Sequence, residues 1–124
     1  MAAVDSSTVI AYFLGNPGKS VEDFDAALAA AAIRIPPPVL AEVLCHPNLP
    51  QRHADLLNSF PTLEILPGFW QRAAQTRLKL LTRGLRARLA DTLIAQCCID
   101  HDEPLIADDT DFRHFAKYCG LKLA

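Results

Sequence analysis

The 124-residue sequence lacks the features of several specialised protein classes. Its longest hydrophobic run, residues 26–33, is mostly alanine and falls far short of the ~20 residues that a membrane span needs. Asp5 stands where a secretory signal would begin its apolar core. No P-loop, GxGxxG or GxSxG motif is present. We therefore expect a cytoplasmic protein with no membrane partner and no nucleophilic serine chemistry.

Excess charge and paired cysteines are also missing. Lys and Arg number 12 against 14 Asp and Glu, a net charge of −2, so any binding to nucleic acid must come from a local basic patch. The four cysteines form no CxxC pair and fit no common zinc spacing, which favours reduced, buried thiols.

What is present indicates one α/β domain spanning residues 1–124. The sequence is 51% hydrophobic and 21% charged, typical of a folded domain, and its 19 Ala and 18 Leu favour helix. Short apolar runs alternate with helical patterns, which predicts a three-layer α/β/α fold with a central parallel sheet of about five strands. We expect strands at 2–5, 33–35, 63–66, 104–107 and 121–123. We expect helices at 7–14, 20–31 (capped by Ser20), 39–45, 51–59, 69–82 and 90–100.

Acidic residues follow these strands closely. Asp5 ends the first strand, and Asp108, Asp109 and Asp111 come after the fourth. In parallel sheets the carboxyl ends of the strands share one edge, where functional residues gather. Each acid taken singly is commonly a turn former or a helix cap.

Two further acids have apolar neighbours on helices near the same edge. Glu42 lies among Leu40, Ala41, Val43 and Leu44, and Asp91 has similar surroundings. Burying a carboxylate among apolar side chains costs free energy unless a cation or a hydrogen-bond donor is paired with it. Clustered carboxylates without Lys or Arg repel one another, and a hard divalent cation such as Mg²⁺ or Mn²⁺ would remove that repulsion. Metal ions held by oxygen ligands are suited to phosphodiester hydrolysis.

The order of the acids resembles that of PIN domains, and in size and motif order the chain is similar to single-domain VapC toxins of bacterial and archaeal toxin–antitoxin pairs. The matching segments begin at residue 4 and end at residue 112: Val4-Asp5-Ser6-Ser7, Pro38-Val39-Leu40-Ala41-Glu42-Val43-Leu44, Leu89-Ala90-Asp91-Thr92-Leu93-Ile94-Ala95 and Leu105-Ile106-Ala107-Asp108-Asp109-Thr110-Asp111-Phe112. Each motif is weak by itself, but four in this order form a specific pattern.

The resemblance implies a Mg²⁺- or Mn²⁺-dependent endoribonuclease. It implies that Asp5, Glu42 and Asp91 are catalytic acids and metal ligands, with Asp109 preferred as the fourth and Asp111 as a supporting ligand. Ser6 matches a small hydroxyl residue that helps to hold the site. The resemblance also implies an antitoxin protein as partner, a homodimer, and tRNA or rRNA as substrate.

One departure from the family pattern supports an alternative. The family usually has Thr or Ser at the position of Ala107, so one hydrogen bond to the acid cluster is lost. The alternative function is a PIN-like binding or scaffold module that no longer cleaves RNA. The complete acid set argues against this alternative.

A basic helix precedes Asp91. No acid occurs from residue 65 to residue 90, whereas this stretch holds half of the Lys and Arg. Helical periodicity, continued past Gly84, places part of this set on one face and Trp70 on an apolar face directed at the core. We expect the following residues to bind RNA or the antitoxin, two uses that the sequence does not separate: Arg72, Lys79, Arg83, Arg86 and Arg88.

Overall fold

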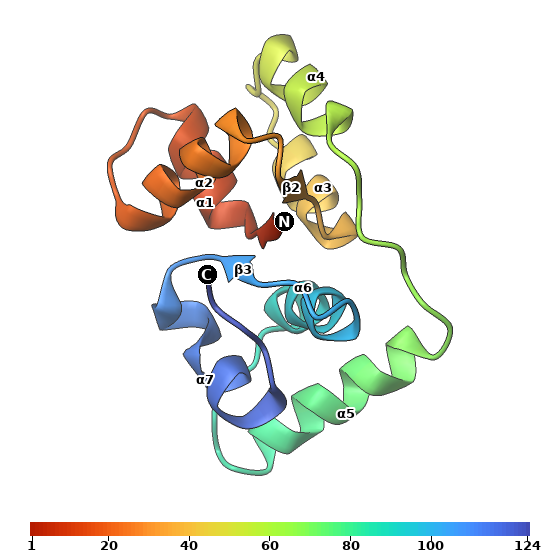
Figure 1. Ribbon diagram of the computed structural model, residues 1–124. Coiled ribbons are helices and arrows are strands. Elements are labelled where there is room, and N and C mark those ends of the chain that lie inside the picture. Colours follow the sequence, from red (N-terminus) through yellow and green to blue (C-terminus); the bar gives the residue numbers. More distant parts are fainter.

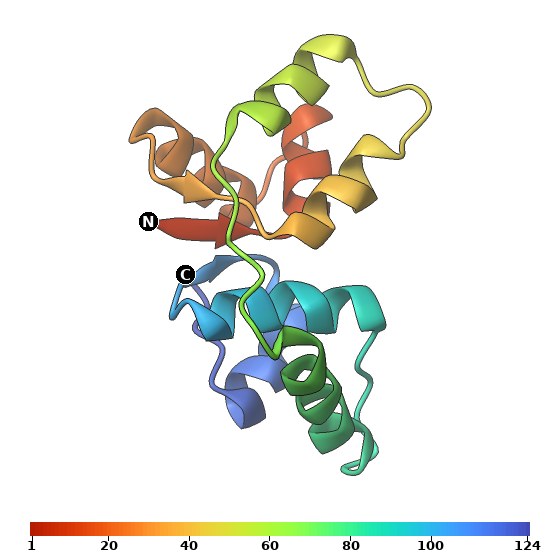
Figure 2. The ribbon, with the colours of Figure 1, turned by 90° about the vertical axis from the view of Figure 1, so that its right-hand side faces the viewer.

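A small parallel sheet separates two groups of helices in the computed structural model, which describes residues 1–124 apart from the side chain of residue 109. Helices α1 to α4 cover one side of the sheet and α5 to α7 cover the other, as the three-layer prediction expected (Figures 1 and 2). The elements are β1 (Ala2–Val4), α1 (Ser6–Phe13), α2 (Lys19–Ala29), β2 (Ile33–Arg34), α3 (Pro37–Leu44), α4 (Gln51–Ser59), α5 (Phe69–Leu81), α6 (Leu89–Asp100), β3 (Leu105–Ile106) and α7 (Asp109–Cys119).

The sheet has the strand order β2-β1-β3, and both pairings are parallel. Strand β1 lies in the middle, so Ala3 and Val4 are fully buried, as expected of a strand covered on both faces. Two predicted strands are reduced to single bridges, between Ile35 and Thr62 and between Leu105 and Leu123. The strand predicted at 63–66 is therefore wrong, although the backbone N–H of Leu63 still donates to Ile35 at 2.9 Å.

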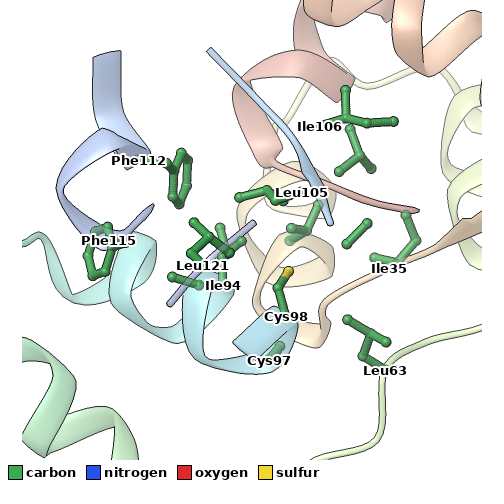
Figure 3. Close-up of a cluster of buried hydrophobic side chains, with 14 of the residues drawn as sticks. Ile35, Leu63, Ile94, Cys97, Cys98, Leu105, Ile106, Phe112, Phe115 and Leu121 are labelled. Atoms are coloured by element: carbon green, nitrogen blue, oxygen red, sulfur yellow. The ribbon is translucent and has the colours of Figure 1, made fainter. Parts of the chain in front are cut away.

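The core continues from the sheet into the layer formed by α6 and α7. Phe112 and Phe115 extend from α7 toward Ile94 of α6 and toward Leu121 near the C-terminus (Figure 3). Cys97 and Cys98 are buried on α6, as predicted, but Cys119 is half-buried and Cys45 is exposed, so the prediction of a buried thiol is wrong for Cys45. None of the described helices is long and apolar enough to cross a membrane.

Helix α7 is an element that the sequence analysis did not predict. Its two buried phenylalanines are three residues apart, which places both on one face, and Gly120 at φ 81° ends the helix in the left-handed conformation. This pairing of apolar spacing with a terminal glycine is the signal that identifies the helix.

Helices α1 and α2 are capped in different ways at their N-terminal ends. Helix α2 begins at Lys19 with Gly18 at its N-cap, and the structure gives it no side-chain cap, so the prediction that Ser20 caps it is wrong. Helix α1 is capped by Asp5, whose carboxylate accepts a hydrogen bond from the backbone N–H of Thr8 at 3.0 Å.

Helix α5 presents to the core a different face from the one predicted. Phe69, Ala73 and Leu80 are buried, whereas Trp70 is 61% exposed and Leu78 is 59% exposed. Polar pairs accompany the buried side: Thr76 donates a hydrogen bond to Gln96 of α6. The prediction that Trp70 lies in the core is therefore wrong.

Candidate active site

Asp5 is fixed at the carboxyl end of the central strand. It is only 3% exposed and accepts hydrogen bonds from the N–H of Thr8 and, at 2.7 Å, from the Ser7 hydroxyl. Burial raises the pKa of Asp5, and these hydrogen bonds offset part of that effect. The cap of α1 therefore also holds a carboxylate at the edge of the sheet.

Glu42 reaches the same edge from α3. The prolines that open this helix, Pro37 and Pro38, suit its first turn, where no intrahelical N–H bond is required. The hydroxyl of Ser6 donates to Glu42 Oε1 at 2.6 Å, joining two residues that lie 36 positions apart in the chain. This hydrogen bond places Ser6 in direct contact with one of the predicted acids, Glu42.

Asp91 and Asp111 complete the group of described acids. Asp91 lies in the first turn of α6, and Asp111 lies in the first turn of α7. Burial raises the pKa of Asp91 to about 6, and Asp111 and Glu42 add to this rise, while Arg88 opposes it. The pKa of Asp91 therefore responds to carboxylates from two other elements.

All four acids line one cavity of about 210 Å³. Its lining residues are Asp5, Ser6, Ser7, Ile10, Glu42, His46, Arg88, Asp91, Ile94 and Asp111. Asp109, the preferred fourth acid, has its side chain outside the described part of the structure, so that preference stays a prediction. The structure brings Asp5, Glu42, Asp91 and Asp111 together from four separate segments.

The donor set of this cavity fits a hard divalent cation. Its acidic side chains offer oxygen ligands only, and the pKa of Asp91 is raised first by burial and then by the neighbouring carboxylates of Asp111 and Glu42. Among the described residues, no three His, Cys, Asp or Glu side chains form a ready group of metal ligands. Mg²⁺ does not require a group of three such side chains, because it commonly binds through one or two carboxylates and keeps several waters.

One family of known proteins matches nearly the whole chain. The model of the PIN domain family matches residues 2–118, which covers all the acids of the cavity. The chain belongs to the PIN domain family. A comparison with curated proteins finds no match.

Two solved structures share the fold of this PIN domain. A chain from the VapBC2 complex of Rickettsia felis, crystallised with a DNA fragment from its promoter, aligns with a TM-score of 0.75 and 19% identity, covering 99% of this chain and 96% of that one. A chain from the toxin–antitoxin complex VapBC-5 of Mycobacterium tuberculosis aligns with a TM-score of 0.69 and 20% identity, covering 98% of this chain and 95% of that one. At these identities the likeness establishes the fold.

The predicted basic residues do not share one helix face in this PIN domain. Helix α5 ends at Leu81, and Gly84, at φ 72°, makes the turn that follows. The N–H groups of Gly84 and Leu85 donate to the carbonyls of Leu81 and Leu80, which is the Schellman pattern of a helix end. The helix ends within a residue of the predicted position, so the condition under which the basic residues would share one face, a helix continued past Gly84, is not met.

These basic residues consequently separate into two groups. Arg86 and Arg88 lie beside Asp91 and Asp111. Arg72 instead forms an ion pair with Asp100 at 2.6 Å, and it lines a separate hollow together with Lys79. Arg83 stacks on Tyr118, with 4.4 Å between its guanidinium carbon and the ring centroid. The described structure thus places only Arg86 and Arg88 of this set at the acids.

The sequence analysis missed three polar residues at the site. Ser7 donates to Asp5, and His46 lines the acid cavity from the segment after α3. His114 lies beside Arg86 in the neighbouring hollow. Their positions in the sequence could have identified two of them, because Ser7 is two residues from Asp5 and His46 is four residues from Glu42.

Proposed function

We propose that this PIN-domain protein is an endoribonuclease that uses Mg²⁺ or Mn²⁺ to hydrolyse RNA phosphodiester bonds. The observation that carries the proposal is the convergence of four carboxylates from separate segments on one cavity, with Arg88 at its edge. Burial and the neighbouring carboxylates together raise the pKa of Asp91, and such a cluster is unfavourable unless a cation offsets the charge.

The carboxylates that would hold the ion are Asp5, Glu42, Asp91 and Asp111, with Asp109 kept as a further ligand predicted from the sequence. A bound ion supplies a hydroxide nucleophile and a Lewis acid for the leaving oxygen. The chain's own residues prepare the site. Ser6 holds Glu42, Ser7 and Thr8 hold Asp5, and Arg88 offers a charged donor to the phosphate.

The biological role that we propose is that of a toxin controlled by a protein antitoxin in the cytoplasm. Two structures with this fold are named as VapBC complexes, one of them as a toxin–antitoxin system. The substrate that we propose is a structured RNA, tRNA or rRNA, as the family resemblance implies. An antitoxin that shields the acid cavity would prevent the enzyme from cutting the RNA of its own cell.

We also propose that the protein forms a homodimer through the exposed apolar face of α5. The described residues include eight exposed large hydrophobic side chains, and half of them line a hollow of about 420 Å³ between α5 and the start of α6. These four are Trp70, Leu78, Leu81 and Leu89. Apolar side chains gathered in this way are typical of an interface.

The nuclease proposal is tested by incubating the purified protein with total RNA in Mg²⁺, Mn²⁺ or EDTA. Asp5→Asn is the informative variant, because Asn caps helices as well as Asp does and the fold should survive. Glu64→Gln, which alters an exposed acid away from the cavity, is the matched control. We expect discrete fragments that require the metal, persist in the control and disappear in Asp5→Asn.

Two results would contradict the nuclease proposal. Cleavage that continues in EDTA or in Asp5→Asn would indicate another mechanism or a contaminating enzyme. A folded protein, free of antitoxin, that neither cleaves RNA nor binds Mn²⁺ by calorimetry would favour the non-catalytic binding module.

The dimer proposal has a separate test. Trp70→Lys places a charge on the exposed apolar face without disturbing the core, so we expect the sedimentation coefficient to fall to that of a monomer while the melting temperature of the monomer is retained. Leu14→Lys, at an exposed position on the other side of the sheet, is the control. A dimer that persists in Trp70→Lys would place the interface elsewhere.

A further inference from the structure

A second, smaller hollow with a different chemical character adjoins the acid cavity. This hollow, of about 170 Å³, shares Arg88, Asp91 and Asp111 with the acid cavity. Its remaining lining residues are Arg86, Thr110 and His114, all of which carry hydrogen-bond donors. The two hollows thus lie side by side, and the smaller one adds hydrogen-bond donors to two of the carboxylates of the larger one.

A hydrogen bond to the backbone fixes the wall of the hollow that carries Arg86 and Arg88. The Nε of Arg77 on α5 donates a hydrogen bond to the carbonyl of Ala87 at 2.8 Å, and Ala87 is only 5% exposed. This hydrogen bond holds the irregular segment on either side of Ala87, so Arg86 and Arg88 are positioned without a helix.

The opposite wall of the hollow is fixed by α7. Phe112 and Phe115 are buried in the core and set the rotation of the helix. Thr110 and His114 are four residues apart on it and therefore lie on one side, next to Asp111. The donors of the hollow consequently come from two independently anchored elements.

The size and chemistry of the hollow indicate its ligand. A volume of about 170 Å³ is below the range of small-molecule sites but sufficient for a phosphate group. Arginine offers planar, charged donors that match phosphate oxygens. Because the hollow adjoins the acid cavity, an anion bound there lies beside the position of the reacting phosphate.

We propose that Arg86, Arg88, Thr110 and His114 form a subsite for the RNA phosphate that neighbours the phosphodiester being cut. This inference rests on the proposed nuclease function and deepens it. It assigns substrate binding to two residues of the predicted basic set and adds two residues that were not in that set. The phosphate is that of the polynucleotide, since a chain spanning both hollows places successive phosphates in them.

The test uses short oligoribonucleotides that span a site cleaved by the wild-type protein, each with one phosphate replaced by a neutral methylphosphonate. For the native oligonucleotide, we expect Arg86→Gln and His114→Gln each to raise KM about tenfold with kcat little changed, as expected for a lost charged hydrogen bond to substrate. Arg113→Gln, an exposed arginine on α7 that does not line this hollow, is the control and should retain the wild-type KM.

The methylphosphonates identify the phosphate concerned. In the wild-type protein, neutralising one phosphate next to the cut should raise KM about as much as Arg86→Gln does. In Arg86→Gln that same substitution should have little further effect, because the contact is already absent. The slope of log KM against log salt should also fall by about 0.7 in Arg86→Gln.

Three outcomes would overturn the subsite. The first is a wild-type KM in both Arg86→Gln and His114→Gln. The second is a KM for Arg86→Gln that every methylphosphonate raises by the same factor as in the wild-type protein. The third is weaker binding of the antitoxin by these variants with an unchanged KM for RNA, which would indicate that the hollow binds an acidic segment of the antitoxin.

Failure of the nuclease proposal would be distinguishable from failure of the subsite. If the wild-type protein cleaves no RNA, inorganic phosphate is titrated into it and followed by NMR. Shifts at Thr110 and His114 that disappear in Arg86→Gln would support the anion site without the nuclease. Their absence would overturn the anion site as well.

Discussion

Replacing Asp91 with Asn is expected to stabilise the folded protein at neutral pH while removing RNA cleavage. Burial, together with Asp111 and Glu42, raises the pKa of Asp91 from its ordinary value of 3.8 to about 6. Between these two values the folded state binds more protons than the unfolded state does, so the free energy of unfolding falls as the pH rises. The loss of stability from ionising Asp91 in the folded protein is absent well below pH 3.8 and complete above about pH 7.

The magnitude follows from the size of this rise in pKa. A rise of about two units corresponds to about 3 kcal/mol, and the partial exposure of Asp91 reduces this to about 1–2 kcal/mol. A negative charge in the first turn of α6 is favourable by ~0.3–1 kcal/mol, and Asn loses this contribution. The penalty from burial and repulsion exceeds this loss, so we expect a net stabilisation of about 1 kcal/mol at pH 7.5.

Urea denaturation in EDTA measures this difference. The wild-type protein, Asp91→Asn and the control Glu64→Gln are compared at pH 4, 5.5 and 7.5. We expect the gap between Asp91→Asn and wild type to grow steadily with pH, whereas Glu64→Gln shows no such trend. An Asp91→Asn protein that is less stable than wild type at pH 7.5, or a gap independent of pH, would refute the reasoning.

Three further predictions concern other parts of the molecule. Ser6→Ala removes the donor to Glu42, so kcat for RNA cleavage should fall about tenfold, and restoration by Thr but not by Val would confirm the role of the hydroxyl. Phe112→Ala should cost about 3–5 kcal/mol in urea denaturation, because this side chain is fully buried, and a loss below 1 kcal/mol would contradict that packing. Iodoacetamide at pH 8 should label exposed Cys45 before Cys97, whose pKa burial raises to about 12, and equal labelling measured by mass spectrometry would show that α6 opens.

The parts of the fold that the sequence predicted are those determined by local chemistry. The prolines at the start of α3 and the acid after β1 act on their immediate neighbours, so both helix starts and the edge of the sheet can be inferred from short segments. Part of the acid set could also be predicted from short segments of sequence. Asp5 and Asp111 follow strands and reach one edge because the strands are parallel, whereas Glu42 and Asp91 lie on helices and were assigned to that edge by their apolar neighbours and by the resemblance to PIN domains.

The orientation of α5 could not be predicted in this way. Its buried side includes Arg72 and Thr76, which look like surface residues until their partners are known. Those partners, Asp100 and Gln96, lie on α6, 28 and 20 positions away. Since a polar residue can be buried when its hydrogen bonds are satisfied, apolar periodicity alone assigned the wrong face to the core.

The site and the core of this PIN domain are linked through α7. Asp111 and His114 line hollows at the surface, while the residues that directly follow them, Phe112 and Phe115, are buried. A rotation of α7 that improved the position of the acid would expose a phenylalanine, at a cost of several kcal/mol. The core therefore fixes the carboxylate in a position where its charge raises the pKa of Asp91. A site that is electrostatically unfavourable by about 1 kcal/mol is maintained by packing that is worth more.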